Sequence, residues 1–130
     1  MEVNKNYIPL KDLEVYKFAR ELSSLGWLVY NEFDWQTKKI ISDQYITSID
    51  SVGANIAEGY ARFYYLDKIR FYYNARGSLS EACDHWLELL LARGKIAPAY
   101  YQKIKQLSIQ TSVKLNNFIS STYRSKINQG

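Results

Sequence analysis

The chain has 130 residues, a formal net charge of +4 and 47% hydrophobic residues. This length fits one domain with its own core, and the hydrophobic fraction argues against wholesale disorder. A single cysteine, Cys83, excludes an internal disulfide and favours a reducing compartment. No apolar run approaches the roughly 20 residues of a membrane span, and the N-terminal MEVNKNYIPL lacks the layout of a signal peptide. We therefore expect a cytoplasmic protein without membrane attachment.

The positive charge is concentrated toward the C-terminus. Residues 1–88 hold 10 Lys and Arg against 13 Asp and Glu, whereas residues 89–130 hold 7 basic residues and no acid. A surface of one sign can bind polyanions, because phosphate contacts release counterions. The same residues can instead form a solvated face that balances acidic neighbours in the fold. The thin spacing favours the second alternative without excluding the first.

A first helix is predicted over about residues 12–33, with Asp12 as its N-cap. Its apolar residues recur at helical spacing in two adjacent stripes. The first stripe is Val15, Ala19, Leu22, Gly26 and Val29, and the second is Phe18, Leu25 and Leu28. Two stripes are more than an isolated four-helix bundle needs.

A second helix is predicted over about residues 35–60, capped by Asp34 and ended by Gly59 with a positive φ. Its inward seam is Ile41, Tyr45, Ser48, Ile49, Val52, Ile56 and Gly59. A third helix is predicted over residues 66–93, where Gly94 stops it. Its inner face is Leu66, Ile69, Tyr73, Arg76, Leu79, Ser80, Cys83, Trp86, Leu87 and Leu90.

A fourth helix is predicted over residues 97–123, with Pro98 in its first turn and a tail that frays after Tyr123. Apolar and Thr residues repeat there every three or four positions, from Ile104 to Thr122. No segment shows the alternation of a strand. Because short connections place neighbouring helices antiparallel, the fold class is all-α, a single-domain up-down-up-down four-helix bundle over residues 1–130.

Polar residues of the second and third helices fall at matching heights if their hairpin is centred on Phe63. Asp50 is then level with Arg76, which predicts an ion pair in the middle of the bundle. Asn55 and Glu58 complete this polar group. We favour a structural role that fixes helix register, while a ligand pocket formed by the same four residues is the alternative.

Aromatic residues crowd around the same hairpin turn and alternate with cations. The aromatic set is Tyr60, Phe63, Tyr64, Tyr65, Phe71, Tyr72 and Tyr73, and the cations are Arg62, Lys68, Arg70 and Arg76. Such mixtures stack on unpaired bases and also form protein–protein interfaces. Tyr72 and Tyr73 cannot both point inward on one helix, so at least one faces outward. An interface between subunits is the simpler interpretation.

Metal and nucleophile chemistry lacks the residues it requires. A bundle di-metal site uses Glu-x-x-His motifs on two helices, whereas the chain has the single histidine His85. Glu81 and His85 share one helix face and form no metal cage, and Cys83 diverges from His85 on a helix. The segment ARGSLSE lacks the glycine and lysine spacing of a phosphate loop. We expect no metal, no cofactor and no enzyme activity.

Three sequence elements resemble those of a known family. Ser48-Ile49 followed by Val52-Gly53-Ala54-Asn55-Ile56-Ala57-Glu58-Gly59 matches S-I-x-x-N-I-A-E-G with three extra residues between Ile49 and Asn55. Ala75-Arg76-Gly77-Ser78-Leu79-Ser80-Glu81 matches A-R-G-S-L-x-E, and Leu13-Glu14-Val15-Tyr16-Lys17 with Ala19-Arg20 is similar to the family's first helix. On these elements the chain, from Leu13 to Ser121, resembles the four-helix-bundle family encoded by intervening sequences in bacterial 23S rRNA genes.

The resemblance implies a ring-shaped homopentamer and no established activity. A related bundle, the accessory variability bundle of diversity-generating retroelements, is a basic pentamer that binds nucleic acid. Motif and neighbouring residues receive structural roles by the same resemblance: Asp50, Asn55, Glu58, Gly59, Arg76, Gly77, Ser78 and Glu81.

These observations predict a non-enzymatic homo-oligomer that binds structured RNA or DNA. Phosphate contacts are predicted for Lys103, Lys105, Lys114 and Arg124, helped by Lys38, Lys39, Arg62 and Arg70. The alternative is a protein–protein interaction scaffold with no nucleic-acid role, because the charge is sparse and aromatic residues are abundant. A third hypothesis is a small-molecule or catalytic site at Asp50, Asn55, Glu58 and Arg76, for which the sequence shows no general base, metal set or phosphate loop.

Overall fold

The computed structural model describes the backbone of residues 7–129 and the side chains of residues 7–125. This part of the chain holds four long helical segments and no strand. A short 3₁₀ turn, η1 (Leu10–Asp12), precedes the first segment. The segments are α1 (Glu14–Tyr30); α2 (Trp35–Thr37) continued by η2 (Lys38–Ser42) and α3 (Asp43–Tyr60); α4 (Tyr65–Ser80) continued by η3 (Glu81–Trp86) and α5 (Leu87–Ala92); and α6 (Pro98–Gln129).

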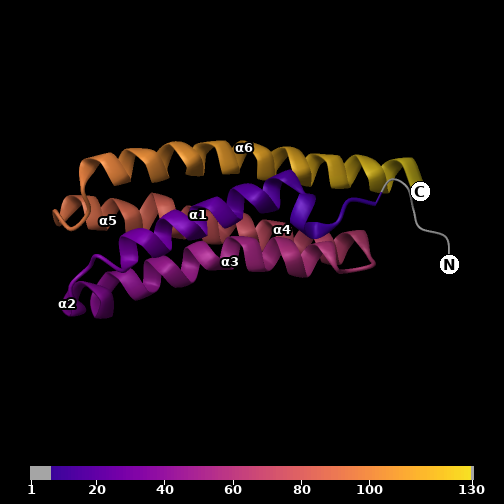
Figure 1. Cartoon of the computed structure of the whole chain (residues 1–130). Helices are drawn as coiled ribbons and strands as arrows, with labels where there is room; N and C mark the ends of the chain where they lie inside the picture. Colours follow the sequence, from indigo (N-terminus) through magenta and orange to yellow (C-terminus); the bar gives the residue numbers. More distant parts are fainter. Residues whose placement is uncertain (1–6, 130) are drawn as a thin grey trace.

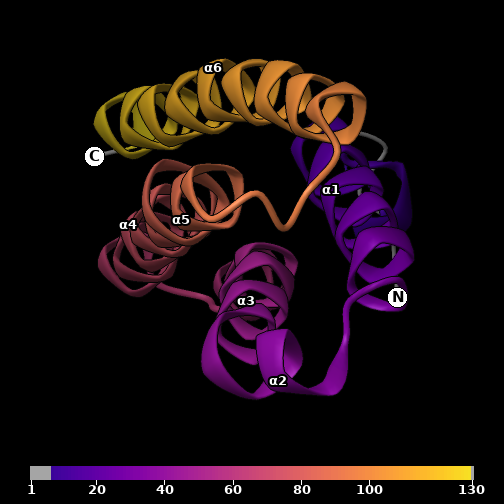
Figure 2. The same cartoon turned by 90° about the vertical axis from the view of Figure 1, so that its left-hand side faces the viewer.

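The four segments lie lengthwise beside one another (Figure 1), and a view along them shows one at each corner of a bundle (Figure 2). α1 contacts α3 and α6, and α4 contacts the same two helices. The face between α1 and α3 is therefore on the opposite side of the bundle from the face between α4 and α6. The arrangement is compatible with the predicted antiparallel up-down-up-down order.

The core follows the predicted apolar periods of the first two segments. The first stripe of α1 is buried in full, and so is the predicted seam of the second segment from Ile41 to Gly59. In the second stripe of α1, Leu25 is half-buried against α6 and Leu28 is exposed. On α6, Ile104, Thr111 and Leu115 are buried. Burying these stripes together supplies the hydrophobic free energy that holds the four segments side by side.

The predicted inner face of the third segment is wrong at several positions. Leu66, Tyr73 and Arg76 are exposed, and the buried residues of α4 are Ile69, Tyr72, Ala75 and Leu79. Tyr72 is 1% exposed and Tyr73 39% exposed, so one tyrosine of the pair does face outward, as predicted. The sequence could not choose between them, because adjacent tyrosines fit the same helical period equally well.

Of the two predicted N-caps, one is confirmed and one is wrong. Asp34 caps its helix as predicted, because its Oδ1 accepts a hydrogen bond from the backbone N–H of Thr37 at 2.8 Å. This bond to the ionised form holds the pKa of Asp34 below its usual value. Asp12 does not cap α1: it lies within η1, and Leu13 occupies the N-cap position without a side-chain hydrogen bond.

The prediction of a positive φ at Gly59 is also wrong. Among the described glycines only Gly94 has a positive φ, of 65°. Gly59 lies inside α3, where a Cβ would meet Tyr72 Cε1 at 2.7 Å and Lys68 O at 3.0 Å. Gly59 therefore permits α3 and α4 to approach closely. Gly94 does end its helix as predicted: its N–H donates to Leu91 O, and the next N–H donates to Leu90 O.

Two short π-helical segments interrupt the middle helices. In η3 the N–H of Leu87 donates to Ala82 O, five residues earlier, instead of to Cys83 O. The Cys83 carbonyl is thereby free for a side-chain partner. At the other end of the chain, α6 continues to Gln129, past the predicted boundary at Tyr123. No helix of the described residues has the length and apolarity of a membrane span.

Candidate nucleic-acid interface

The eight predicted phosphate-binding residues do not form one surface. Lys38 and Lys39 lie in η2 at one end of the bundle, and Arg62 and Arg70 lie around the α3–α4 turn at the other. The remaining four are distributed along α6: Lys103, Lys105, Lys114 and Arg124. Any contact with a polyanion must therefore use only part of this set.

The cations at the two ends of the bundle rest on aromatic rings. Lys38 Nζ lies 4.9 Å from the ring centre of Tyr30, and Lys39 Nζ lies 5.0 Å from that of Trp35. At the other end, Arg62 and Arg70 both lie over Phe71. Arg62 also pairs with the predicted motif residue Glu58 at 2.6 Å, and Arg70 with Asp67 at 3.9 Å. Carboxylates therefore offset the charges of Arg62 and Arg70, whereas Lys38 and Lys39 contact aromatic rings and form no ion pair with a described side chain.

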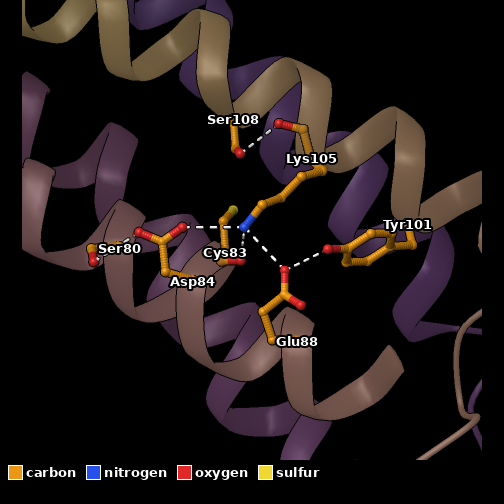
Figure 3. Close-up of polar contacts among 7 residues, drawn as sticks. All are labelled: Ser80, Cys83, Asp84, Glu88, Tyr101, Lys105 and Ser108. Carbon is orange, nitrogen blue, oxygen red and sulfur yellow. Dashed lines mark hydrogen bonds and ion pairs between the residues drawn. The ribbon is translucent and has the colours of Figure 1, made fainter. Parts of the chain in front are cut away.

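Lys105 is surrounded by acceptors from the neighbouring helix (Figure 3). Its Nζ donates to Cys83 O at 2.9 Å, the carbonyl that η3 leaves free, and lies 3.2 Å from Asp84 Oδ1 and 3.1 Å from Glu88 Oε1. The hydroxyl of Tyr101 donates to the same oxygen of Glu88. Lys105 of α6 therefore connects α6 to the π-helical segment η3 through a hydrogen bond and an ion pair.

The protonation states of this network follow from the same contacts. Burial opposes the charge of Lys105, but its hydrogen bonds to Glu88 and Asp84 leave its pKa above the ordinary lysine value. Hydrogen bonds from Tyr101 and Lys105 lower the pKa of Glu88. Because two carboxylates balance the charge of Lys105, a phosphate would have to compete with them for its ammonium group.

Lys114 is also paired, with Glu14 Oε1 at 2.8 Å, and Lys95 lies 3.9 Å from Asp34. Three lysines of the basic C-terminal region thus neutralise acids of the first 88 residues, in line with the alternative of internal charge balance. Lys103 and Arg124 are exposed and form no ion pair with any described side chain.

A cleft of about 550 Å³ lies between α1 and α6 and contains Lys103. Arg20 lines the cleft from the facing helix, and its guanidinium contacts the Tyr16 hydroxyl at 3.3 Å. The other lining residues are Glu21, Ser24, Leu25, Gln106, Leu107 and Gln110. Two cations, a hydroxyl and two amides offer donors to phosphate oxygens, against one carboxylate. Sequence reasoning missed Arg20, because it lies in the acidic part of the chain and only the fold brings it to α6.

The predicted ion pair between Asp50 and Arg76 is wrong. Asp50 lines a groove between α1 and α3, whereas Arg76 turns to α6, where it contacts Asn116 Oδ1 at 3.3 Å. Its guanidinium lies 4.6 Å from the ring centre of Tyr73. The prediction failed because it assigned Arg76 to the inner face of its helix, one position out of register.

The other polar motif residues serve local structure. Asn55 Nδ2 donates to Ser51 O at 2.8 Å within α3. Glu81 accepts a hydrogen bond from Trp86 Nε1 at 2.8 Å, across the π-helical segment, and Ser78 is half-buried in α4. The four residues of the hypothetical ligand pocket thus point to different neighbours. Burial raises the pKa of the Cys83 thiol to about 12, and the described residues contain no cluster of three acidic, His or Cys residues suited to a metal ion.

The α3–α4 turn carries two strongly exposed aromatic side chains. Phe63 is 85% and Tyr64 68% exposed, with their rings edge to face at 5.1 Å. Leu66 beside them is also exposed. Large apolar side chains gathered at one tip are typical of contact surfaces.

Comparison with known proteins gives a family and a fold. The family model described as "23S rRNA-intervening sequence protein" matches residues 11–117. A solved structure from Bacteroides thetaiotaomicron, a protein of unknown function from the S23 ribosomal protein family, has a TM-score of 0.73 and 24% identity. The match covers 82% of this chain and 95% of that one, which makes the two folds alike. A search of curated proteins found no match.

Proposed function

Because the chain belongs to the family of 23S rRNA-intervening sequence proteins, we propose that it is a cytoplasmic, non-enzymatic four-helix bundle that binds structured RNA or DNA. In this proposal the bundle is antiparallel and assembles into a homo-oligomer of five copies. The observation that carries nucleic-acid binding is the α1/α6 cleft, where Arg20 and Lys103 face one space without a carboxylate ion-pair partner.

The cleft suits a phosphate backbone better than a base. Arg20 and Lys103 supply charge from opposite walls, and Ser24, Gln106 and Gln110 supply neutral donors between them. Such groups contact phosphate and sugar oxygens regardless of sequence. We therefore expect binding that depends on nucleic-acid shape and salt, with little discrimination among sequences. Arg124, toward the C-terminal end of α6, is a further exposed cation outside the cleft.

The test compares two double variants by fluorescence anisotropy with an RNA hairpin. The double variant Arg20→Glu, Lys103→Glu reverses the charge of the two cations in the cleft. The double variant Lys39→Glu, Arg70→Glu makes the same residue changes at the two ends of the bundle. Both variants lose the same net charge. We expect the cleft variant to bind at least about tenfold more weakly and its salt slope to fall by about 2, since each phosphate contact contributes about one to the slope.

The end variant controls for net charge, and we expect it to retain most of the affinity. Equal weakening by both variants would mean that only total charge matters, and no weakening by the cleft variant would show that phosphates do not enter the cleft. Either result would overturn the assignment. Circular dichroism checks that each variant retains its helical content.

The exposed aromatic tip favours a second candidate, a protein-interaction scaffold without nucleic-acid binding. Phe63 and Tyr64 present rigid apolar rings of the kind that dominate binding energy at protein interfaces. Capture from a nuclease-treated native lysate would support this function by recovering a stoichiometric partner that the Phe63→Ala, Tyr64→Ala variant fails to recover. Loss of every partner on nuclease treatment would argue against it.

A further inference from the structure

Two opposite charges lie on opposite faces of the bundle without an ion-pair partner. Asp50 is exposed in the α1/α3 groove, and Arg76 is exposed in the α4/α6 groove. Neither forms an ion pair with any side chain of residues 7–125. The α1/α3 and α4/α6 faces point in opposite directions (Figure 2). Within one chain the two charges therefore cannot meet, whereas between two copies they can.

Gly77 lies beside Arg76, and no contact among the described residues requires a glycine there. A Cβ at this position would meet no heavy atom within 4 Å, in contrast to the tight contacts at Gly59. An interior glycine destabilises a helix relative to alanine, so an exposed one without a close neighbour is unexpected. Close approach of another backbone is a common reason for glycine in such a place.

The surroundings of Gly77 form a receptive surface. The α4/α6 groove has a volume of about 590 Å³, and its polar lining includes Ser80, Ser108 and Ser112. Asp84 also lines it, with its charge offset by Lys105 at 3.2 Å. Ile109 and Val113 border it and are 59% and 54% exposed. Removing these two aliphatic side chains from water would stabilise a contact. The groove thus combines exposed apolar area, a missing side chain and an arginine.

The opposite face offers a matching partner surface. Around Asp50 the α1/α3 groove is lined by Ser23, Gly53, Ala54 and Ala57, whose side chains are small. Small residues let a second helix approach the α3 backbone closely. Arg20 of α1 lines both this groove and the α1/α6 cleft, and its guanidinium contacts the Tyr16 hydroxyl and forms no ion pair with Asp50. Asp50 therefore remains available to an external cation.

We propose that the α1/α3 face of one copy docks on the α4/α6 face of the next, with Asp50 of one copy paired to Arg76 of the other and the contact centred on Gly77. The proposal rests on the self-association in the proposed function and names its surfaces. Gly59 packs against residues 68–72, which places Asp50 and Arg76 within about one helical turn of the same height. Successive copies are then related mainly by rotation, the condition under which a head-to-tail contact closes into a ring.

The test is sedimentation velocity of charge-reversed variants. Asp50→Arg and Arg76→Asp each place like charges opposite each other, and we expect each to associate at least about tenfold more weakly than the wild type. The double variant Asp50→Arg, Arg76→Asp restores opposite charges at every contact for any number of copies in the ring, so we expect association to return. Arg70→Asp, on the same helix outside the groove, is the matched control and should associate like the wild type.

A substitution at Gly77 separates folding from docking. Gly77→Gln places a long side chain in open space within one copy, so we expect an unchanged or higher thermal stability of the isolated copy together with weakened association. Unaffected association in the single variants Asp50→Arg and Arg76→Asp, or a double variant that stays dissociated, would overturn the proposed contact alone. A wild-type protein that sediments as a monomer at every concentration would overturn the self-association as well.

Discussion

Gly59→Ala tests how closely α3 and α4 pack. The added methyl would lie 2.7 Å from Tyr72 Cε1, 2.9 Å from Phe71 Cβ and 3.0 Å from Lys68 O. Lys68 O is a backbone atom and Phe71 Cβ is attached directly to the backbone, so neither can rotate away from the added methyl. Tyr72 is fully buried, with its ring 4.8 Å from that of Phe118, so it cannot move freely either. The substitution forces the helices apart.

The magnitude follows from two opposing effects. Overpacking a core by one methyl costs about 1–3 kcal/mol, while replacing glycine by alanine in a helix returns at most about 1 kcal/mol. We expect a net loss of about 1–2 kcal/mol in the free energy of unfolding. Gly77→Ala is the matched control, because its methyl meets nothing within 4 Å. Within one dissociated copy the added methyl changes helix propensity alone, and we expect a stabilisation of about 0.5–1 kcal/mol.

Urea denaturation followed by circular dichroism measures both variants. It should be carried out at a protein concentration low enough to keep the copies dissociated, because self-association shifts apparent stability. The expected result is a lower urea midpoint for Gly59→Ala and a higher one for Gly77→Ala, with unchanged slopes. A Gly59→Ala protein as stable as the wild type would refute the close approach of α3 and α4.

Three further outcomes follow from the network around η3. Lys105→Met leaves the Cys83 carbonyl and two carboxylates without their cation. Because Lys105 is partly exposed, we expect the free energy of unfolding, measured by urea denaturation, to fall by about 1–2 kcal/mol. Lys103→Met is the control, for which we expect little change. Tyr101→Phe removes the hydrogen bond that lowers the pKa of Glu88, so carboxyl NMR titration should show this pKa rise. Because the lowered pKa stabilises the fold at pH values above the pKa of Glu88 in the unfolded chain and loses this effect as pH falls through its folded value, the variant should lose less stability on acidification. The buried Cys83 thiol, with its raised pKa, should resist a thiol reagent at pH 8 in the native protein and react fully in denaturant.

The sequence predicted the helices well because their signals are local. The stripe from Val15 to Val29, the Asp34 cap and the stop at Gly94 depend on residues a few positions apart. Inner and outer faces were harder to assign in the third segment, where Tyr72 and Tyr73 satisfy the same period. Neither could the sequence indicate the π-helical segments, since an extra backbone residue per turn leaves no side-chain signature.

The candidate site was less predictable because it depends on which helices become neighbours. Lys105 and Lys103 are two residues apart and similar in sequence context, yet one meets Asp84 and Glu88 and the other faces the cleft. Arg20 contributes from a distant part of the chain. Charge counts along the sequence cannot distinguish a paired lysine from an available one, whereas ion-pair geometry can.

The most direct test of the central claim is a fluorescence-anisotropy titration of the nuclease-treated wild-type protein with a structured RNA hairpin at several salt concentrations. We expect submicromolar binding at low salt that weakens steeply as salt rises, with a slope that reports the number of phosphates contacted. Absence of binding at low salt, or binding that is indifferent to salt, would contradict a phosphate-binding cleft between α1 and α6.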